Sequence, residues 1–339
     1  MPKRFLGNIM TDAPTAPAGP FKDGAASGVW SLAEALSYTK GGLWPIAGNA
    51  APRAFFAGGE SNARKNEIEF ITITTLGNAT DFGDLSVAKY FCGSCSSTLR
   101  GIIAGGTNDS TAYDVIEYIT NASAGNVTDF GNLTVGNKSS VGLSNNIRGV
   151  FPGGETSNGV DLNSIDYITI ASTGDAADFG DVASSAVVYP GTCASPTRGL
   201  IMGGLKAASS NIIDYLTIGS TGNTTDFGDL TAVSNRGAAC SSATRGLHGL
   251  GNAPGTVNTI DFVTIASTGN ATDFGDLTVA RSYMSAASSL IRGVWGGGAG
   301  SDVIDYVTMA SAGNATDFGN IASGKLALTA FGSGHGGLA

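Results

Sequence analysis

One phrase recurs six times along the chain and restricts what the chain can fold into. Its clearest copy runs from Ile260 to Leu277 and reads IDFVTIASTGNATDFGDL. Close copies begin at Ile68, Ile116, Ile165, Ile213 and Ile304. An Arg that heads a short apolar run precedes every copy, at Arg53, Arg100, Arg148, Arg198, Arg245 and Arg292, with successive spacings of 47, 48, 50, 47 and 47 residues. Six units with a period near 48 residues are typical of the blades of a β-propeller.

Each unit reads as four short strands. Residues 284–289 are typical of a first strand of small side chains, 101–106 of an apolar second strand, and 165–170 of a β-branched and aromatic third strand. The fourth strand is centred on the Asp-Phe-Gly phrase, which starts at Asp81, Asp129, Asp178, Asp226, Asp273 and Asp317. Gly, Asn and Ser fill the links, as turns require. We therefore expect an all-β, six-bladed propeller over residues 52–339; the competing trimeric β-helix usually has shorter coils.

The two ends of the repeat complement each other. Residues 326–334 match the first strand of a unit but no second strand follows, whereas the first unit begins at its second strand, near Arg53. We predict that the C-terminal strand completes the first blade and closes the ring. A closed ring leaves no exposed terminal blade to cap.

Residues 1–51 lie outside the repeat and form a separate N-terminal extension. Three prolines between positions 14 and 20 predict an extended lead. Ser31 and Glu34 form a capping box, which predicts one short helix over residues 32–40. The extension either packs on the propeller or docks the protein onto a larger assembly. The residues that we expect to carry such docking are Phe5, Phe21, Trp30, Leu36 and Trp44.

Charge and hydropathy exclude several classes of protein. The net charge is −9, so the clustered cations that bind nucleic acid or anionic membranes are missing. No apolar run is long enough to span a membrane, and the chain from Met1 onward shows no secretory signal. We recognise no cofactor-binding motif and expect no cofactor.

The four cysteines favour packing over chemistry. Cys95, Cys193 and Cys240 each precede a repeated Arg by five residues, where the last unit has Ala287, so this position is expected to hold a small buried side chain. Cys92 and Cys95 have the C-x-x-C spacing of metal and redox sites, but no second pair or nearby His accompanies them.

The repeated acids allow two interpretations. One acid per unit stands in the third strand, at Glu69, Glu117, Asp166, Asp214, Asp261 and Asp305, and each offers an ion pair to a repeated Arg. In the Asp-Phe-Gly phrase, we expect the Asp to bond the turn backbone, the Phe to pack between blades and the Gly to allow the bend. The alternative is a ring of calcium sites built from Asp81 and Asp84 and their equivalents, although no EF-hand spacing occurs.

Catalytic constellations are not recognisable in the sequence. The two histidines are His248, inside an apolar run, and His335, and no triad order or zinc spacing includes them. An acid pair for a depolymerase is not convincing either. Four aromatic residues are candidates for binding a glycan, although they suit packing equally well: Tyr90, Phe91, Tyr189 and Tyr283.

These units resemble Kelch-type propellers. Gly pairs end the second strand at Gly58-Gly59, Gly105-Gly106, Gly153-Gly154, Gly203-Gly204 and Gly296-Gly297, whereas the fifth unit has Leu250-Gly251. The third strand carries an aromatic residue at Phe70, Tyr118, Tyr167, Tyr215, Phe262 and Tyr306. Arg281 stands where Kelch blades often have Arg, although Arg is not regular there. Phe replaces the usual fourth-strand Trp, which departs from the Kelch pattern.

Several segments have a distinctive sequence: IDYVTM at 304–309, GNATDFGN at 313–320 and the segments 28–32 and 42–45. In these segments the chain resembles repeat proteins of tailed bacteriophages, especially those of marine bacteria and cyanobacteria. This resemblance implies a non-enzymatic virion protein, assembled in the host cytoplasm in multiple copies, with other virion proteins as partners. A tail or fibre position is expected, with the extension as anchor. The alternatives are a capsid decoration protein and a lectin for host surface glycan.

Overall fold

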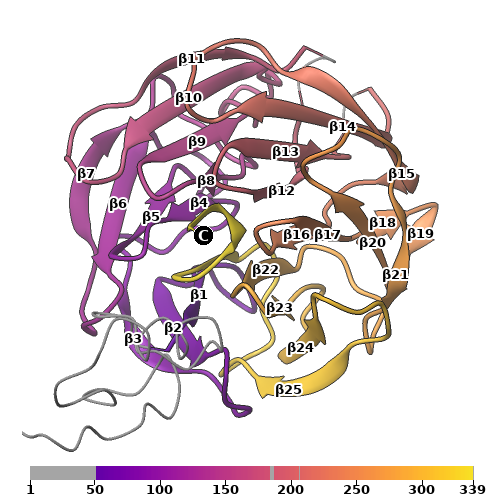
Figure 1. Ribbon diagram of the computed structural model, residues 1–339. Helices are drawn as coiled ribbons and strands as arrows, with labels where there is room; N and C mark the ends of the chain where they lie inside the picture. Colours follow the sequence, from indigo (N-terminus) through magenta and orange to yellow (C-terminus); the bar gives the residue numbers. More distant parts are fainter. Residues whose placement is uncertain (1–50, 184–186, 206, 339) are drawn as a thin grey trace, which may run out of the picture. The chain divides into compact units, whose positions relative to one another are not determined.

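The computed structural model describes residues 51–338, except 184–186 and 206. The described residues form 26 β-strands and one short 3-10 helix, η1 (Gly336–Leu338). Twenty-four of the strands make six four-stranded sheets that stand around a central axis as blades (Figure 1). The expected six-bladed propeller is confirmed. The predicted helix over 32–40 lies outside the described residues.

The first three blades share one plan, with their strands ordered from the axis outward. Blade 1 consists of β26 (Thr329–Gly332), β1 (Arg53–Ala57), β2 (Glu67–Thr72) and β3 (Thr80–Asp84). Blade 2 consists of β4 (Gly93–Ser96), β5 (Arg100–Ala104), β6 (Val115–Thr120) and β7 (Thr128–Asn132). Blade 3 consists of β8 (Leu143–Ser144), β9 (Arg148–Pro152), β10 (Ser164–Thr169) and β11 (Ala177–Asp181).

The other three blades repeat this plan. Blade 4 consists of β12 (Gly191–Ala194), β13 (Arg198–Met202), β14 (Ser210–Thr217) and β15 (Thr225–Ser234). Blade 5 consists of β16 (Ala238–Ser241), β17 (Arg245–Gly249), β20 (Thr259–Thr264) and β21 (Thr272–Asp276), with the small hairpin β18 (Asn252–Ala253) and β19 (Gly255–Thr256) inserted. Blade 6 consists of β22 (Ser285–Ser288), β23 (Arg292–Gly296), β24 (Val303–Thr308) and β25 (Thr316–Asn320).

The C-terminal strand closes the ring, as the repeat predicted. Strand β26 pairs antiparallel with β1, and Phe331 lies opposite Phe55. The two phenyl rings are stacked, with centroids 5.1 Å apart. Beyond the strand, the Ser333 N–H donates to the Arg53 carbonyl at 2.9 Å. The first blade is therefore assembled from both ends of the repeat.

A β-bulge explains the Asp-Phe-Gly phrase in every blade. In blade 1, Ile68 pairs with Gly83 and Glu69 pairs with Asp81, so Phe82 is the extra residue. The same register shift recurs in the other five blades. Each bulge Phe is buried and meets the third-strand aromatic of its own blade edge to face, at 5.8 Å for Phe82 and Phe70. The predicted packing role of the Phe is confirmed.

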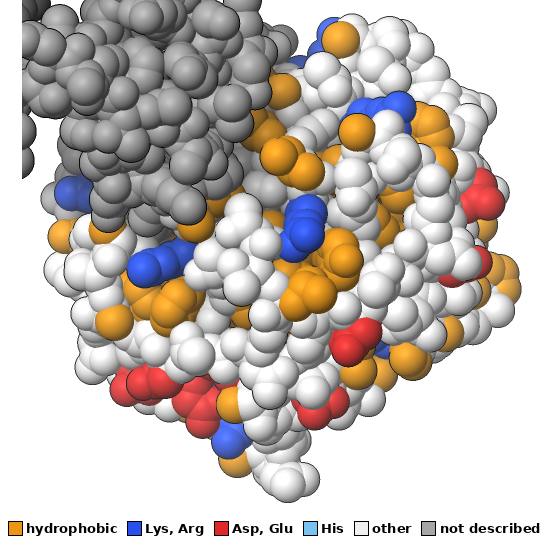
Figure 2. All heavy atoms as spheres, turned by 60° about the horizontal axis from the view of Figure 1, so that its bottom comes forward, with side chains coloured by type: hydrophobic (Ala, Val, Ile, Leu, Met, Phe, Trp, Pro, Cys, Tyr) orange, Lys and Arg blue, Asp and Glu red, His pale blue; other side chains and the backbone are white. Residues whose placement is uncertain are grey.

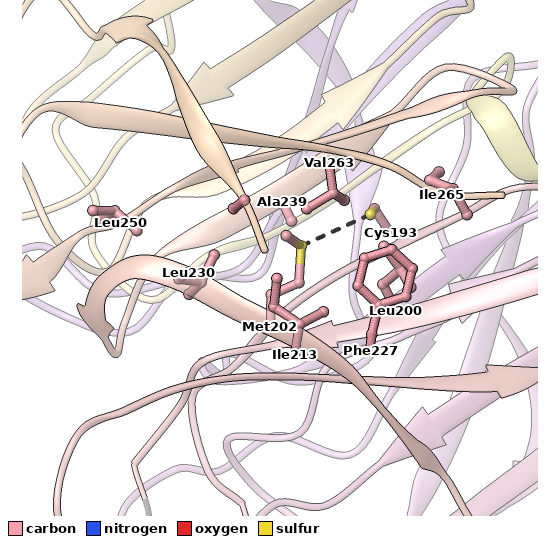
Figure 3. Close-up of a cluster of buried hydrophobic side chains, with 11 residues drawn as sticks. Cys193, Leu200, Met202, Ile213, Phe227, Leu230, Ala239, Leu250, Val263 and Ile265 are labelled. Atoms are coloured by element: carbon pink, nitrogen blue, oxygen red, sulfur yellow. Dashed lines mark hydrogen bonds between the residues drawn. The ribbon is translucent and has the colours of Figure 1, made fainter. Parts of the chain in front are cut away.

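The hydrophobic core is divided among the six contacts between neighbouring blades. The contact between blades 4 and 5 joins Phe227 and Cys193 of blade 4 to Val263 and Ile265 of blade 5 (Figure 3). Both faces of each sheet are therefore covered, which accounts for the nearly continuous apolar runs of the strands.

The Gly pairs bring each second strand against the next blade. Gly105 and Gly106 have φ of 64° and 92°, and a Cβ on Gly105 would lie 2.4 Å from the Asn137 carbonyl oxygen. In the sixth blade the pair with these angles is Gly297-Gly298. The sequence assignment of Gly296-Gly297 is wrong by one residue, because a run of three glycines hides the register.

The position five residues before each repeated Arg is buried, as expected, but it is not restricted to small side chains. Leu143 occupies it in blade 3, and in blade 1 its equivalent in the closing strand is Phe331, which pairs with Phe55 as Cys95 pairs with Ile102. The following blade leaves room for this side chain because it has a glycine there. A Cβ on Gly199 would lie 2.6 Å from Leu143, and one on Gly293 would lie 2.7 Å from Cys240. The Gly after the repeated Arg is thus required by its neighbour's side chain.

Candidate functional site

The repeated arginines connect neighbouring blades and do not pair with the third-strand acids. Arg100 stacks over Tyr118 of its own blade at 4.5 Å and donates from Nη1 to the Ile170 carbonyl of the next blade at 3.0 Å. All six arginines repeat both contacts. The predicted Arg–acid pairs are wrong, because Arg100 lies opposite Thr120, at the far end of the third strand from Glu117.

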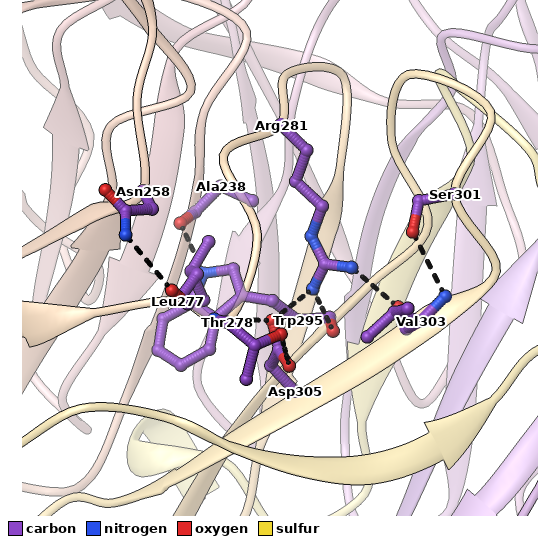
Figure 4. A network of polar contacts seen from close by, with 9 residues as sticks. All are labelled: Ala238, Asn258, Leu277, Thr278, Arg281, Trp295, Ser301, Val303 and Asp305. Carbon is purple, nitrogen blue, oxygen red and sulfur yellow. Dashed lines mark hydrogen bonds and ion pairs between the residues drawn. The ribbon is translucent and has the colours of Figure 1, made fainter.

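Other cations pair with these acids in three blades. Lys89 lies 2.8 Å from Glu117, Lys325 lies 2.6 Å from Glu69, and the Arg281 guanidinium lies 2.9 Å from Asp305, and all six side chains are buried. Figure 4 shows the Arg281 guanidinium pointing at Asp305, close to the Thr278 hydroxyl. The sequence hid this set because the position holds a cation in only three of the six blades, and the cation is Lys in two and Arg in one.

Two of the other acids are held by threonine. The Thr134 hydroxyl donates to Asp166 at 2.7 Å, and Thr231 does the same to Asp261. Burial raises the pKa of both carboxyls, and the Thr hydrogen bonds oppose this. In both cases the Thr belongs to the preceding blade, so these acids also join blades.

The aspartates of the Asp-Phe-Gly phrase are exposed at the outer edge of the blades. Asp273 accepts a hydrogen bond from the Gly275 N–H at 3.0 Å, which is the turn contact that the sequence predicted. Within residues 51–338, apart from 184–186 and 206, no group of three or more His, Cys, Asp or Glu is arranged to hold a metal ion.

The cysteines are buried thiols. Cys92 and Cys95 belong to two different core clusters, so their C-x-x-C spacing serves packing. Burial raises the pKa of Cys92 to about 11 and that of Cys193 to about 12. The thiolate is the reactive and metal-binding form, and burial suppresses it at neutral pH.

Both histidines are held neutral inside the ring. His248 is 1 % exposed, and burial lowers its pKa to about 3. Its Nε2 lies 2.9 Å from the Ser234 hydroxyl. His335 follows the closing strand, and its Nδ1 accepts the Gly337 N–H at 3.1 Å. His248 is thus a buried core residue, and its Nδ1 has no hydrogen-bond partner among the described residues.

Six residues with left-handed backbone surround one mouth of the central channel. They precede the innermost strands at equivalent positions, with φ between 55° and 62°: Phe91, Ser139, Tyr189, Arg236, Tyr283 and Ala327. Each N–H donates to the carbonyl of the equivalent residue in the preceding blade, from 2.8 to 3.2 Å, and the six bonds form a closed circle. We call these six residues the mouth ring.

Three aromatic side chains of the mouth ring come from alternate blades and meet at the axis. The Phe91 centroid lies 5.1 Å from that of Tyr189 and 5.6 Å from that of Tyr283, and the two tyrosine rings are 6.1 Å apart. Tyr90 packs beside Phe91 at 4.7 Å. The structure thus brings together all four aromatic residues that the sequence nominated.

Arg236 completes the mouth ring with a positive charge. Its guanidinium lies 4.8 Å from the Tyr283 centroid and 5.4 Å from that of Tyr189. Within the described part of the chain, no carboxylate pairs with it, and its buried Nε has no hydrogen-bond partner. Sequence reasoning missed Arg236, although it stands nine residues before Arg245, as Phe91 does before Arg100.

A cavity of about 120 Å³ lies at this mouth, and its lining combines small and apolar residues with hydroxyls, the three aromatic rings of the mouth ring and Arg236. Ser139 and Ser140 line it and are 2 % and 3 % exposed, and their hydroxyls have no hydrogen-bond partner among the residues that the structure describes. Burial raises the pKa of Tyr283, which keeps its phenol protonated. The mouth can therefore donate several hydrogen bonds to a small ligand and place one positive charge, that of Arg236, beside it.

Serines connect the innermost strands deeper in the channel. The Ser144 hydroxyl donates to the Ser96 carbonyl at 2.7 Å and accepts the Ser96 N–H at 3.1 Å, and Ser241 does the same to Ala194. The tail that follows β26 lies against this level, because His335 contacts Ser144 and a Cβ on Gly336 would collide with the Ser242 carbonyl. The mouth ring is thus the end of the channel away from the C-terminal tail.

The described helix η1 is too short to cross a membrane, and no other helix there is long and apolar enough. No model of a known protein family matches the chain, and no curated protein is similar to it. The likeness that the structure itself establishes is to six-bladed β-propellers as a fold.

Proposed function

We propose that this protein is a non-enzymatic structural component of a tailed-phage virion, a Kelch-like propeller displayed on the tail or fibre and anchored by residues 1–51. The observation that supports this most is how the repeated polar residues are used: Arg100 and Asp166, like their equivalents, bind the neighbouring blade. Such contacts make a rigid platform. The phage assignment depends on the sequence resemblance, and the docking residues lie outside the described part.

One face of the propeller supports attachment to another protein. Leu99, Ile147 and Ile291 are 71 %, 66 % and 63 % exposed. Each directly precedes a repeated Arg, as Pro52 precedes Arg53, so they share the end of the blades at which the chain arrives from the extension. Figure 2 shows exposed hydrophobic side chains beside Lys and Arg on the side of the molecule it presents. Exposed apolar patches mark interaction surfaces.

The proposal is tested on purified particles from a culture that carries the gene. An antibody to the propeller, viewed by electron microscopy, is expected to label the tail or fibre. Label spread over the head instead would support the alternative, a capsid decoration protein. Particles that contain no peptides of this protein by mass spectrometry would overturn the virion assignment.

A further inference from the structure

We propose that the mouth ring binds the terminal acidic sugar of a polysaccharide, with Arg236 holding the sugar carboxylate. This goes beyond a structural role, and it stands whether or not the protein belongs to a virion. Three independent features of the mouth carry the proposal: an unpaired guanidinium, an aromatic wall and buried hydroxyls without partners.

The guanidinium selects the charge of the ligand. Arg64, Lys65, Lys89, Lys138, Arg281 and Lys325 each pair with a carboxylate. The six repeated arginines donate to backbone carbonyls instead. Arg236 does neither within the described residues, and two tyrosine rings hold its planar group in place. An ordered guanidinium binds carboxylate through two parallel hydrogen bonds.

The rings and hydroxyls select the body of the ligand. Tyr189 and Tyr283 are partly exposed and line the cavity, so their apolar ring atoms can contact the C–H groups of a pyranose. A buried hydroxyl left unpaired destabilises the unliganded site. Sugar hydroxyls can supply partners to Ser139 and Ser140, which line the same cavity.

The size and backbone of the mouth favour an end-on sugar over a longer chain or a peptide strand. The cavity of about 120 Å³ is smaller than one of about 150 Å³ that holds a benzene ring, so it takes the carboxylate end of one terminal sugar while the rest of that sugar lies outside. The N–H and C=O groups of the mouth ring already bond one another. They are therefore not free to pair with an added peptide strand.

The test compares three ligands on the full-length protein by titration calorimetry. Methyl β-glucuronide is the probe, methyl β-glucoside is its neutral counterpart, and sodium acetate supplies the carboxylate alone. We expect the glucuronide to bind at least about tenfold more tightly than either of the others, because it alone supplies both the sugar ring and the carboxylate. A tenfold difference in affinity corresponds to about 1.4 kcal/mol of binding free energy. Equal binding of the glucoside or of acetate would overturn the assignment, and so would an absence of glucuronide binding.

Two variants test whether the glucuronide binds at the mouth ring. Arg236→Gln is expected to abolish glucuronide binding, whereas Lys65→Gln, which removes a charge paired with Glu67 outside the mouth, should leave it unchanged. The unfolding midpoint of each variant shows whether the ring is intact. Full binding by Arg236→Gln, or tighter binding of a short peptide through its free carboxylate, would overturn the proposal. Because none of these measurements involves particles, failure here is distinguishable from failure of the virion assignment.

Discussion

One buried position in each blade shows how a side chain sets the size of its neighbour in the next blade. Cys240 faces Gly293, whereas the next contact along the ring joins Ala287 and Ala54 in one core cluster. Ala287 is smaller than Cys240. Ala54, which packs in the same cluster as Ala287, is larger than Gly293 by one carbon. In these two contacts the larger first side chain is matched with the smaller second residue, as close-packed interiors require.

This pairing predicts a compensating double substitution. Gly293→Ala alone should destabilise the protein by about 1–3 kcal/mol, because its Cβ would lie 2.7 Å from the Cys240 sulfur. Adding Cys240→Ala recreates the Ala287 and Ala54 arrangement and should restore most of that loss. Urea unfolding of the wild type, both single variants and the double variant measures the coupling. Simple additivity of the two single effects would contradict the size-matching account.

His248 predicts how stability depends on pH. Burial lowers its pKa in the folded protein to about 3, below the value of about 6.5 in an unfolded chain. The unfolded state therefore binds more protons between these pH values, and the stability due to neutral His248 is lost as pH falls through that window. His248→Gln should show a shallower fall in unfolding free energy between pH 7 and pH 4, measured in urea. His335 is present in both proteins, so a slope identical to wild type would show that His248 does not titrate as described.

At the scale of the strand, the buried ion pairs fix the loops that lead into three of the blades. Lys89 and Lys325 each stand two residues before a mouth-ring residue, and each pairs with an acid of the third strand. The pair thereby anchors the backbone that enters the innermost strand. Blade 3 has Asn137 at the corresponding position, and its amide donates to the Gly153 carbonyl at 2.7 Å.

Breaking one such pair should be costly. Lys89→Met leaves Glu117 buried without its cation and is expected to destabilise the protein by about 3–5 kcal/mol. The control is Lys65→Met, which removes a partly exposed pair with Glu67 and should cost less than about 1 kcal/mol. Thermal and urea unfolding of both variants give the comparison. Similar small losses would mean that the buried pair contributes no more than a surface one.

The strands were predictable from sequence because period, β-branched runs and Gly-Asn turns are local signals. The bulge Phe and the closing strand followed from the same repeat. The partners of Arg100 and Glu117 did not follow, because they depend on which residues stand opposite across strands and on loops from the next blade. Only part of the mouth ring could be predicted from the sequence. Its aromatic residues are recognisable by their type, whereas Arg236 and Ser139 differ in type from their equivalents and are recognised by position alone.

At the scale of the whole molecule, closure of the ring by β26 can be tested directly by deleting that strand. Removal of residues 326–339 deletes β26, which covers β1 and contributes Phe331 to the contact with blade 2. We expect the unfolding midpoint to fall by more than about 10 °C, since each kcal/mol shifts a protein of this size by about 2–4 °C. Removal of residues 335–339 alone keeps β26 and should shift the midpoint less. An unchanged midpoint for the longer deletion would refute closure by this strand.

The pairing of β26 with β1 also determines when during synthesis the molecule can be completed. The Arg53 N–H donates to the Ser333 hydroxyl, which is 280 residues further along the chain, so the first blade cannot be completed until residues 329–333 have been made. Contacts of such long range form late and slowly. A nascent chain that stops early can build blades but cannot join them into a circle. A closed ring therefore forms only in chains whose translation has passed β26, the last strand of the repeat.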